Sequence, residues 1–302
     1  MKAIDALWKC SPEEVVKKSG PTVTFCGICI QRKEDGYFIH QRPYIKDLLK
    51  KYRLEECNAT KIILDKESDD ADKSEEEETE EWKQWKESPE FTMKVREAQK
   101  IAGEVLWLTT RTRPDLCYPI QKMTSISTRN PEKALKYGFR MLRYLKGTEN
   151  HGLKYVDAEA TKGKFKEQSK DWPAEVYKEG TVCVWTDSSF APQKNKKCQG
   201  ALVVTQIGSP IFWKCGVQAL IATSTAESEL QMLVKGSLAA QNVGMMVKEM
   251  LKPIKKKERR LETIKELEER EEFAEDTRDE DQSEEPDVLC VDNKAATQIL
   301  DQ

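Results

Sequence analysis

Three acidic residues are candidates for a metal-dependent active site. Asp187 and Asp292 each end a segment with the apolar pattern of a strand, VCVWTD and VLCVDN, and Glu229 lies near the start of a helix predicted between them. If the two strands are neighbours in a sheet, the carboxylates meet at one edge, where their repulsion favours hard divalent cations that take oxygen ligands. Two such ions about 4 Å apart can activate a water and stabilise the leaving oxygen in phosphodiester hydrolysis.

Residue type and spacing alone leave other interpretations of these acids open. Aspartate often caps a turn after a strand, so either aspartate alone has a purely structural explanation. The helix start, STAESELQML, also offers Glu227. Because residues two apart on a helix point in different directions, only one of the two glutamates can face the metals.

The elements that would position these acids form a mixed α/β layer. Strands are predicted at 181–187, 200–206 and 210–216, and a turn at Gly208 makes the last two antiparallel neighbours. A Ser/Thr cap signal starts a long helix at 223–252. Five of its apolar residues are expected in the core: Leu230, Leu233, Leu238, Met245 and Met246.

Charge is strongly segregated along the chain. The formal net charge is −3 for 302 residues, but residues 67–81 carry ten acids and one lysine, which predicts a solvated linker. A second charged tract, 252–287, is basic at its start and acidic at its end, and we interpret it as an insertion. Residues 92–154, in contrast, hold 13 Lys/Arg against 5 Asp/Glu, a net of +8, which suggests an anionic partner bound at one place.

A helix is predicted at 130–147 inside the basic segment. Asn130 suits its N-cap, Pro131 its first turn and Gly147 its C-terminal end. The expected buried stripe is Leu135, Phe139 and Leu142, and four cations share another face: Lys133, Lys136, Arg140 and Arg143. Four cations on one face could follow a phosphate backbone, although an ordinary charged surface is the simpler interpretation.

The cysteines and apolar runs argue against other classes of protein. Nine scattered cysteines and two histidines do not form a disulfide framework, and Cys26 and Cys29 are interpreted as buried thiols rather than half a zinc site. The N-terminus has no signal-peptide core and no run of 18 apolar residues occurs. We therefore expect an intracellular protein without a membrane partner.

From residue 181 onward the chain resembles the ribonuclease H domain of copia-type retrotransposon Pol polyproteins. The matching stretches are VWTDSSFA, GALVVTQIGSPIFWKCGVQALIATSTAESELQML and VDNKAATQIL. Upstream, the region that follows the polymerase palm in the same polyproteins is similar to FCGICIQRKEDGYFIHQRPYIKDLLKKY, TTRTRPDLCYPIQKM, NPEKALKYGFRMLRYLKGT and HGLKY.

The resemblance implies an α/β fold class and four regions. Residues 1–65 would be the end of a reverse-transcriptase palm or thumb, 66–90 an acidic linker, and 91–156 a basic, helical connection-like segment. The N-terminal part as a whole would be mainly helical. Residues 181–302 would form a ribonuclease H-like mixed sheet with flanking helices, interrupted by the charged insertion.

The implied activity is hydrolysis of the RNA strand of an RNA–DNA hybrid with two Mg²⁺ or Mn²⁺ ions. Asp187, Glu229 and Asp292 would hold the ions. Glu229 is chosen over Glu227 because the family's glutamate precedes an apolar residue, as Glu229 precedes Leu230. Glu227 would then be a capping or outer group. Ser188, Asn293 and the four cations of the basic helix would contact the hybrid. The remaining partner would be the rest of the polyprotein, in a cytoplasmic virus-like particle or the nucleus.

Departures from the family pattern lead to further expectations. The family's fourth acid, on a later helix, has no counterpart before Gln302, and Asp301 is too close to Asp292 to replace it. The paired-aspartate box of the palm is missing, since SDDAD at 68–72 lacks its apolar flanks, so we expect no polymerase activity. The alternative function is an inactive, truncated remnant that only binds nucleic acid. The order Asp, Glu, Asp argues against an integrase, whose glutamate comes last.

Overall fold

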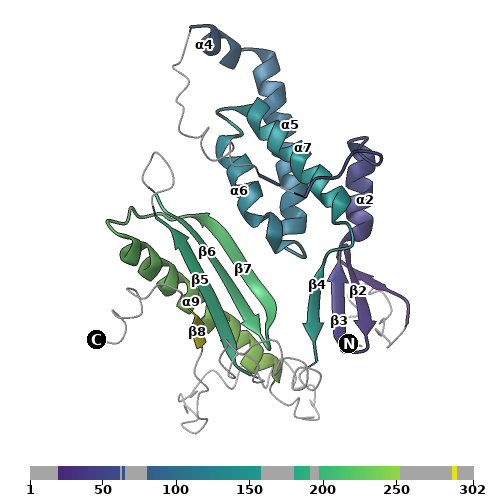
Figure 1. Ribbon diagram of the computed structural model, residues 1–302, viewed down its shortest axis with the longest axis vertical. Coiled ribbons are helices and arrows are strands. Elements are labelled where there is room, and N and C mark those ends of the chain that lie inside the picture. The colour runs from purple at the N-terminus through teal and green to yellow at the C-terminus, as the bar shows by residue number, and fades with distance from the viewer. Residues whose placement is uncertain are drawn as a thin grey trace, which may run out of the picture.

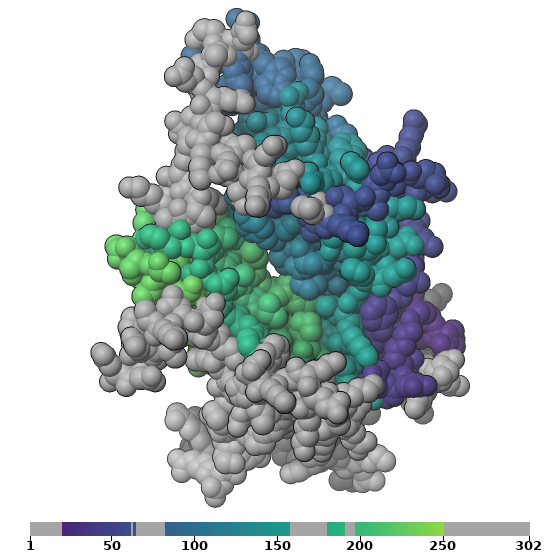
Figure 2. All heavy atoms as spheres, viewed as in Figure 1, coloured from purple at the N-terminus to yellow at the C-terminus, as the bar shows by residue number. Residues whose placement is uncertain are grey.

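The structure, a computed structural model, describes residues 20–61, 63–64, 80–157, 180–190, 197–251 and 288–290. The described chain is mixed α/β, as the sequence predicts, with two four-stranded sheets and a cluster of packed helices (Figure 1). We call the helices of residues 42–51 and 80–147 the helical cluster. In the space-filling view of Figure 2 the helices between residues 80 and 147 are blue to teal, and the part of the chain from 180 to 251 is green.

The first part of the chain contributes one sheet and the helical cluster. The sheet is antiparallel in the order β1-β2-β3-β4, and its last strand pairs Leu153 with Ile39 of β3. The elements in chain order are β1 (Val23–Phe25), β2 (Ile28–Lys33), β3 (Gly36–His40), α2 (Arg42–Lys51), α4 (Glu80–Lys86), α5 (Pro89–Thr109), η2 (Pro114–Leu116), α6 (Cys117–Ile126), α7 (Pro131–Gly147) and β4 (Leu153–Val156).

The N-terminal part is mainly helical, as expected, but it also contains this four-stranded sheet, which was not predicted. Its strands are short, and β4 reaches β3 only after the whole helical cluster has intervened in sequence. Pairing between strands so far apart is not encoded in any local periodicity. The β1–β2 turn has positive φ angles at Cys26 (48°) and Gly27 (73°), as a two-residue hairpin requires. That turn exposes Cys26, so the prediction of two buried thiols is right for Cys29 and wrong for Cys26.

The helical cluster packs α7 closely against α5 and α6. A methyl group added at Gly138 of α7 would lie 2.9 Å from Ile101 of α5 and 2.9 Å from Met123 of α6, so only glycine permits this approach. Asn130 caps α7 through its side chain, which accepts a hydrogen bond from Lys133 N at 3.0 Å, as predicted. The fully buried residues of the cluster include Ile45, Ile101, Val105, Leu108, Leu116, Met123, Met141, Leu142 and Leu145.

A buried arginine joins the α5–α6 connection to the end of α7. The Arg113 side chain is 1% exposed and donates from Nε and Nη2 to the Asp115 carboxylate, the shorter bond being 2.7 Å. Its Nη1 donates to Thr148 O at 3.1 Å and its Nη2 to Thr148 Oγ1 at 2.8 Å, just beyond α7. The guanidinium group also lies 5.4 Å from the ring centre of Tyr144.

The second sheet has the strand order β7-β6-β5-β8. Its elements are β5 (Val182–Ser189), β6 (Gln199–Gln206), β7 (Ser209–Val217), the helix α9 (Thr225–Leu251) and β8 (Val288–Cys290). The three strands and the helix predicted between 181 and 252 are confirmed. Strands β5, β6 and β7 are antiparallel neighbours, whereas β8 runs parallel to β5 on its free side.

Helix α9 covers one face of the second sheet with a single stripe. Met232, Ala240 and Val247 are buried in one cluster with apolar side chains of β5 and β6, and Leu233 is buried as well. The prediction that Leu238, Met245 and Met246 are buried is wrong, since all three are exposed. Sequence alone did not indicate which apolar side of the helix would meet the sheet.

The opposite face of the second sheet is directed toward the helical cluster. Trp213 of β7 donates its indole N–H to Thr109 O at the end of α5, at 2.8 Å, and α6 packs against the same strand. Desolvation by burial raises the pKa of the Cys117 thiol, at the start of α6, to about 12. Among the helices that the structure describes, none is both long and apolar enough to cross a membrane.

Replacing Arg113 with lysine tests the importance of the buried arginine. Lysine keeps the charge but cannot make the forked contact to Asp115 or reach Thr148 at the same time. We expect Arg113→Lys to lower the free energy of unfolding by about 3 kcal/mol, because it leaves buried polar groups without donors. Urea unfolding followed by circular dichroism measures this change.

The matched control is Arg111→Lys, at an exposed arginine that lies over the Trp107 ring in the same connection. Its effect should stay within about 0.5 kcal/mol. Equal losses of stability for the two variants would contradict a special role for Arg113.

Candidate functional site

Strand β5 lies between β6 and β8 and ends at the candidate site. Its parallel pairing with β8 joins Cys183 to Val288, Val184 to Leu289 and Trp185 to Cys290. Parallel neighbours bring their carboxyl ends to the same edge of a sheet. The two strands predicted to end on aspartates are therefore adjacent and run in the same direction, although Asp292 and Asn293 themselves lie outside the described residues.

Asp187 is exposed near the end of β5, on the face of the sheet opposite α9. Alternation along the strand turns Val184 and Thr186 toward the helix, where both lie close to Gly236 of α9. Asp187 falls on the other face, in one cross-strand row with Ala201 and Cys215. This is the face that Trp213 joins to the helical cluster, so the Asp187 carboxylate is directed to the side where the first part of the chain lies.

Glu227 caps helix α9 and is not a site residue by its contacts. Glu227 N donates to Ser224 Oγ at 3.1 Å, and the Glu227 carboxylate accepts from Thr223 N and Thr223 Oγ1, both at 2.6 Å. This pattern is a variant of the capping box, in which the Glu227 carboxylate accepts from the backbone N–H of Thr223 instead of that of Ser224. The Thr223 hydrogen bonds lower the pKa of Glu227. The capping role expected for this residue is confirmed.

Glu229 enters from α9 and reaches the end of β5. It is only 3% exposed, and its Oε1 accepts a hydrogen bond from Ser188 N at 3.2 Å. Ser188 Oγ and Ser228 Oγ lie 2.7 Å apart and fix the same junction. A buried carboxylate requires donors or a cation. The structure thus brings Glu229 to the residue that directly follows Asp187, from the opposite face of the sheet.

Two glycines and one buried glutamine hold the α9 start against the strands. A methyl group at Gly200 of β6 would lie 2.2 Å from Met232 Sδ, and one at Gly236 would lie 2.5 Å from Thr186 Cγ2. Gln218, which is 1% exposed, donates to Ser228 O at 3.0 Å. The glycines could have been found from the sequence, because glycine inside a helix or strand often marks close approach. No sequence pattern indicates the role of Gln218.

The described residues contain two of the three predicted metal ligands. No group of three His, Cys, Asp or Glu residues that could hold a metal ion occurs within the part of the chain that the structure describes. Asp187 and Glu229 supply carboxylate oxygens only, which is the donor type that Mg²⁺ and Mn²⁺ prefer. The donor chemistry fits such ions, and the third predicted ligand, Asp292, lies outside the described residues.

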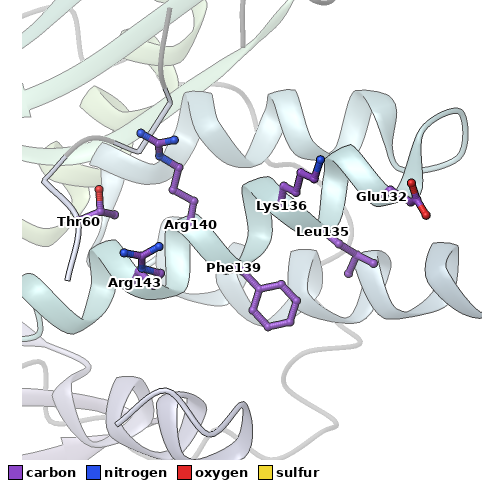
Figure 3. Close-up of a pocket in the computed structure, with 7 residues that line it drawn as sticks. All are labelled: Thr60, Glu132, Leu135, Lys136, Phe139, Arg140 and Arg143. Carbon is purple, nitrogen blue, oxygen red and sulfur yellow. The ribbon is translucent and has the colours of Figure 1, made fainter. Parts of the chain in front are cut away.

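A cationic groove of about 520 Å³ follows α7, as Figure 3 shows. Lys136, Arg140 and Arg143 contribute its positive charge from successive turns, while Lys133 lies outside it, 5.7 Å from the Tyr137 ring centre. Leu135 and Phe139, predicted to be buried, are partly buried and line the groove beside the cations. Thr60 lies at the Arg143 end and Glu132 at the other end.

Compared with protein-family models, the chain matches none, and no solved structure matches it.

A methyl group at Gly236 should separate α9 from β5. Because the added carbon would overlap Thr186 Cγ2, we expect Gly236→Ala to lower the free energy of unfolding by about 1–3 kcal/mol. Chemical denaturation measures the effect. Gly103→Ala, in α5 with no heavy atom within 4 Å of the added carbon, is the control and should stabilise by about 0.5–1 kcal/mol. Equal behaviour of the two variants would show that α9 does not depend on this close contact.

Proposed function

We propose that the chain is an RNA–DNA hybrid ribonuclease with a ribonuclease H-like second sheet, derived from a retrotransposon polyprotein. The observation that carries the proposal is the junction at the end of β5. There, a central strand with an exposed aspartate near its end meets a buried helical glutamate and runs parallel to the strand predicted to supply the third acid.

The register of the parallel pair supports a role for Asp292. Trp185 lies opposite Cys290, and each preceding pair keeps the same offset. Continued by two residues, that offset would bring position 292 beside Asp187. The proposal therefore assigns Asp187, Glu229 and Asp292 as the acids that would hold two Mg²⁺ or Mn²⁺ ions.

When bound, the ions would supply Lewis-acid stabilisation of the negative charge that develops during phosphodiester hydrolysis. The protein residues have separate tasks. The Ser188 N–H holds the Glu229 carboxylate in one orientation, which limits the reorganisation that binding a cation requires. Ser188 and Asn293 are proposed to contact the hybrid, whose RNA strand is distinguished by its 2′-hydroxyl groups.

A second candidate function is nucleic-acid binding without cleavage. It is favoured by the cationic groove of α7, which lies in the helical cluster and does not use the carboxylates. Phosphate binding by lysine and arginine requires no metal, and its strength depends steeply on salt. The two candidates make different predictions for the acidic and the basic residues.

Removing either described carboxylate should abolish cleavage and keep binding. We expect Asp187→Asn and Glu229→Gln each to reduce the rate of hybrid cleavage in Mg²⁺ by at least about 100-fold, since each removes an oxygen ligand of the ions. A labelled RNA–DNA hybrid resolved on a denaturing gel measures cleavage, and fluorescence anisotropy measures binding. EDTA should stop the reaction.

Glu227→Gln is the matched control, because Glu227 caps the helix two residues away from Glu229. It should retain most of the activity. If the unsubstituted chain does not cleave the hybrid but binds it, the second candidate is the correct one; if Glu227→Gln is as inactive as Glu229→Gln, the assignment of the ligand is wrong.

Reversing the charge of the α7 groove should weaken binding of the hybrid. The variant that combines Lys136→Glu, Arg140→Glu and Arg143→Glu should bind the hybrid with a weaker dependence on salt. The magnitude of the slope of log affinity against log salt should decrease by about three, because each of the three cations would neutralise one phosphate. Lys133→Glu, outside the groove, should change the slope less. Unchanged affinity at low salt for all four reversals would end the idea that α7 binds nucleic acid.

A further inference from the structure

We infer that the chain's own acidic segment, residues 67–78, occupies the cationic groove of α7 and competes there with other polyanions. This inference concerns the groove alone and does not depend on the proposed nuclease activity.

The charges of groove and segment are complementary. Lys136, Arg140 and Arg143 line the groove, and the acid among its described lining residues, Glu132, lies 2.5 Å from Lys94 Nζ of α5. The segment carries eight acids and one lysine between residues 67 and 78. A run of carboxylates presents the same repeated negative charge as a phosphate backbone, so the groove that suits one suits the other.

The described chain stops at one end of the groove. Thr60 N donates to Arg143 O at 3.3 Å, Arg143 Nε donates to Asn58 O at 2.8 Å, and Leu64 packs against the helical core. Asn58 and Thr60, a few residues before the acidic segment, are therefore attached to the C-terminal half of α7, at Arg143.

The described chain resumes toward the other end of the groove. Trp85 of α4 packs edge-on against Phe91 at the start of α5, with ring centres 4.9 Å apart. One turn further along α5, Lys94 contacts Glu132 in the first turn of α7. The described residues on the two sides of the acidic segment therefore lie toward opposite ends of α7.

The length of the intervening chain is sufficient to span α7. The 17 residues of α7 extend for about 25 Å. The 15 residues from 65 to 79 span up to about 50 Å when extended. A tether of this kind gives the segment an effective concentration in the millimolar range. Even if the contact has a weak dissociation constant of about 0.1 mM, the groove would therefore be unoccupied in only about a tenth of the molecules.

Carbodiimide cross-linking tests the contact directly on the full chain. At about 0.15 M salt, peptide mass spectrometry should find Lys136 joined to carboxylates of residues 67–78, and the product should disappear at about 1 M salt, where the Debye length is about 3 Å. Absence of this product overturns the inference. So does a Lys136 product with residues 272–285 instead, or one that joins two chains, which would identify a second copy as the occupant.

Polyphosphate affinity provides the second measurement, with a matched control in the same chain. Changing the eight acids of 67–78 to Asn or Gln should raise affinity about tenfold at 0.15 M salt. The same change at eight acids of the other tract, between 272 and 285, alters net charge equally but should raise the affinity less than about twofold, because net charge acting through solvent is screened by salt.

The gain in affinity must also depend on the groove. In a chain that carries Lys136→Gln, Arg140→Gln and Arg143→Gln, neutralising residues 67–78 should no longer change polyphosphate affinity. An equal gain from both acidic tracts, or a gain that persists without the groove cations, would overturn the inference. If the chain does not cleave the hybrid but residues 67–78 are cross-linked to Lys136 and compete with polyphosphate, this inference is supported and the proposed nuclease activity is wrong.

Discussion

A buried guanidinium group must have its hydrogen bonds satisfied inside the protein, and Arg113 meets that requirement by joining the two ends of the helical cluster. Its partners are Asp115 in its own connection and Thr148 after α7. Residues next to Arg113 reach two further elements: Thr112 Oγ1 donates to Gln41 Oε1 before α2 at 2.9 Å, and Thr109 O, in the last residue of α5, accepts from Trp213 of β7. One short segment thus positions both the basic helix and the second sheet, because α7, α2 and β7 are attached to it.

Local signals in the sequence predicted helices α7 and α9 and strands β5, β6 and β7, whereas the helices and strands that precede α7 were not predicted individually. The strands near 181, 200 and 210 alternate clearly, and Asn130 and Pro131 mark the start of α7 by side-chain chemistry that acts within four residues. The contact of Arg113 with Thr148 and the pairing of β3 with β4 join residues far apart in sequence, for which a single chain gives no periodic signal. The same limit explains the exposed Leu238, since helical periodicity identifies apolar sides but not the one that a sheet will cover.

At the candidate site, residue type and spacing predicted the meeting of β5, β8 and the start of α9. The hydrogen bond between Glu229 and Ser188 N and the buried Gln218 that holds the start of α9 are known only from the structure. The separation of Glu227 from Glu229 follows from geometry: the first faces back to Thr223 and the second reaches Ser188. The approach of Asp187 and Glu229 from opposite faces was not foreseen. It arises because strand alternation turns Asp187 away from α9, while the buried glutamate reaches around the strand end to a backbone amide.

The late position of β8 in the chain has a consequence for how the second sheet is assembled. Strands β5, β6 and β7 pair with near neighbours in sequence, so they can fold as a meander with α9 soon after synthesis. The β8 strand must return across a long connection to reach the open side of β5, which is entropically costly and slow. Until it arrives, β5 presents an unpaired edge to the cell, and the growing chain is most susceptible to wrong strand pairing during that interval.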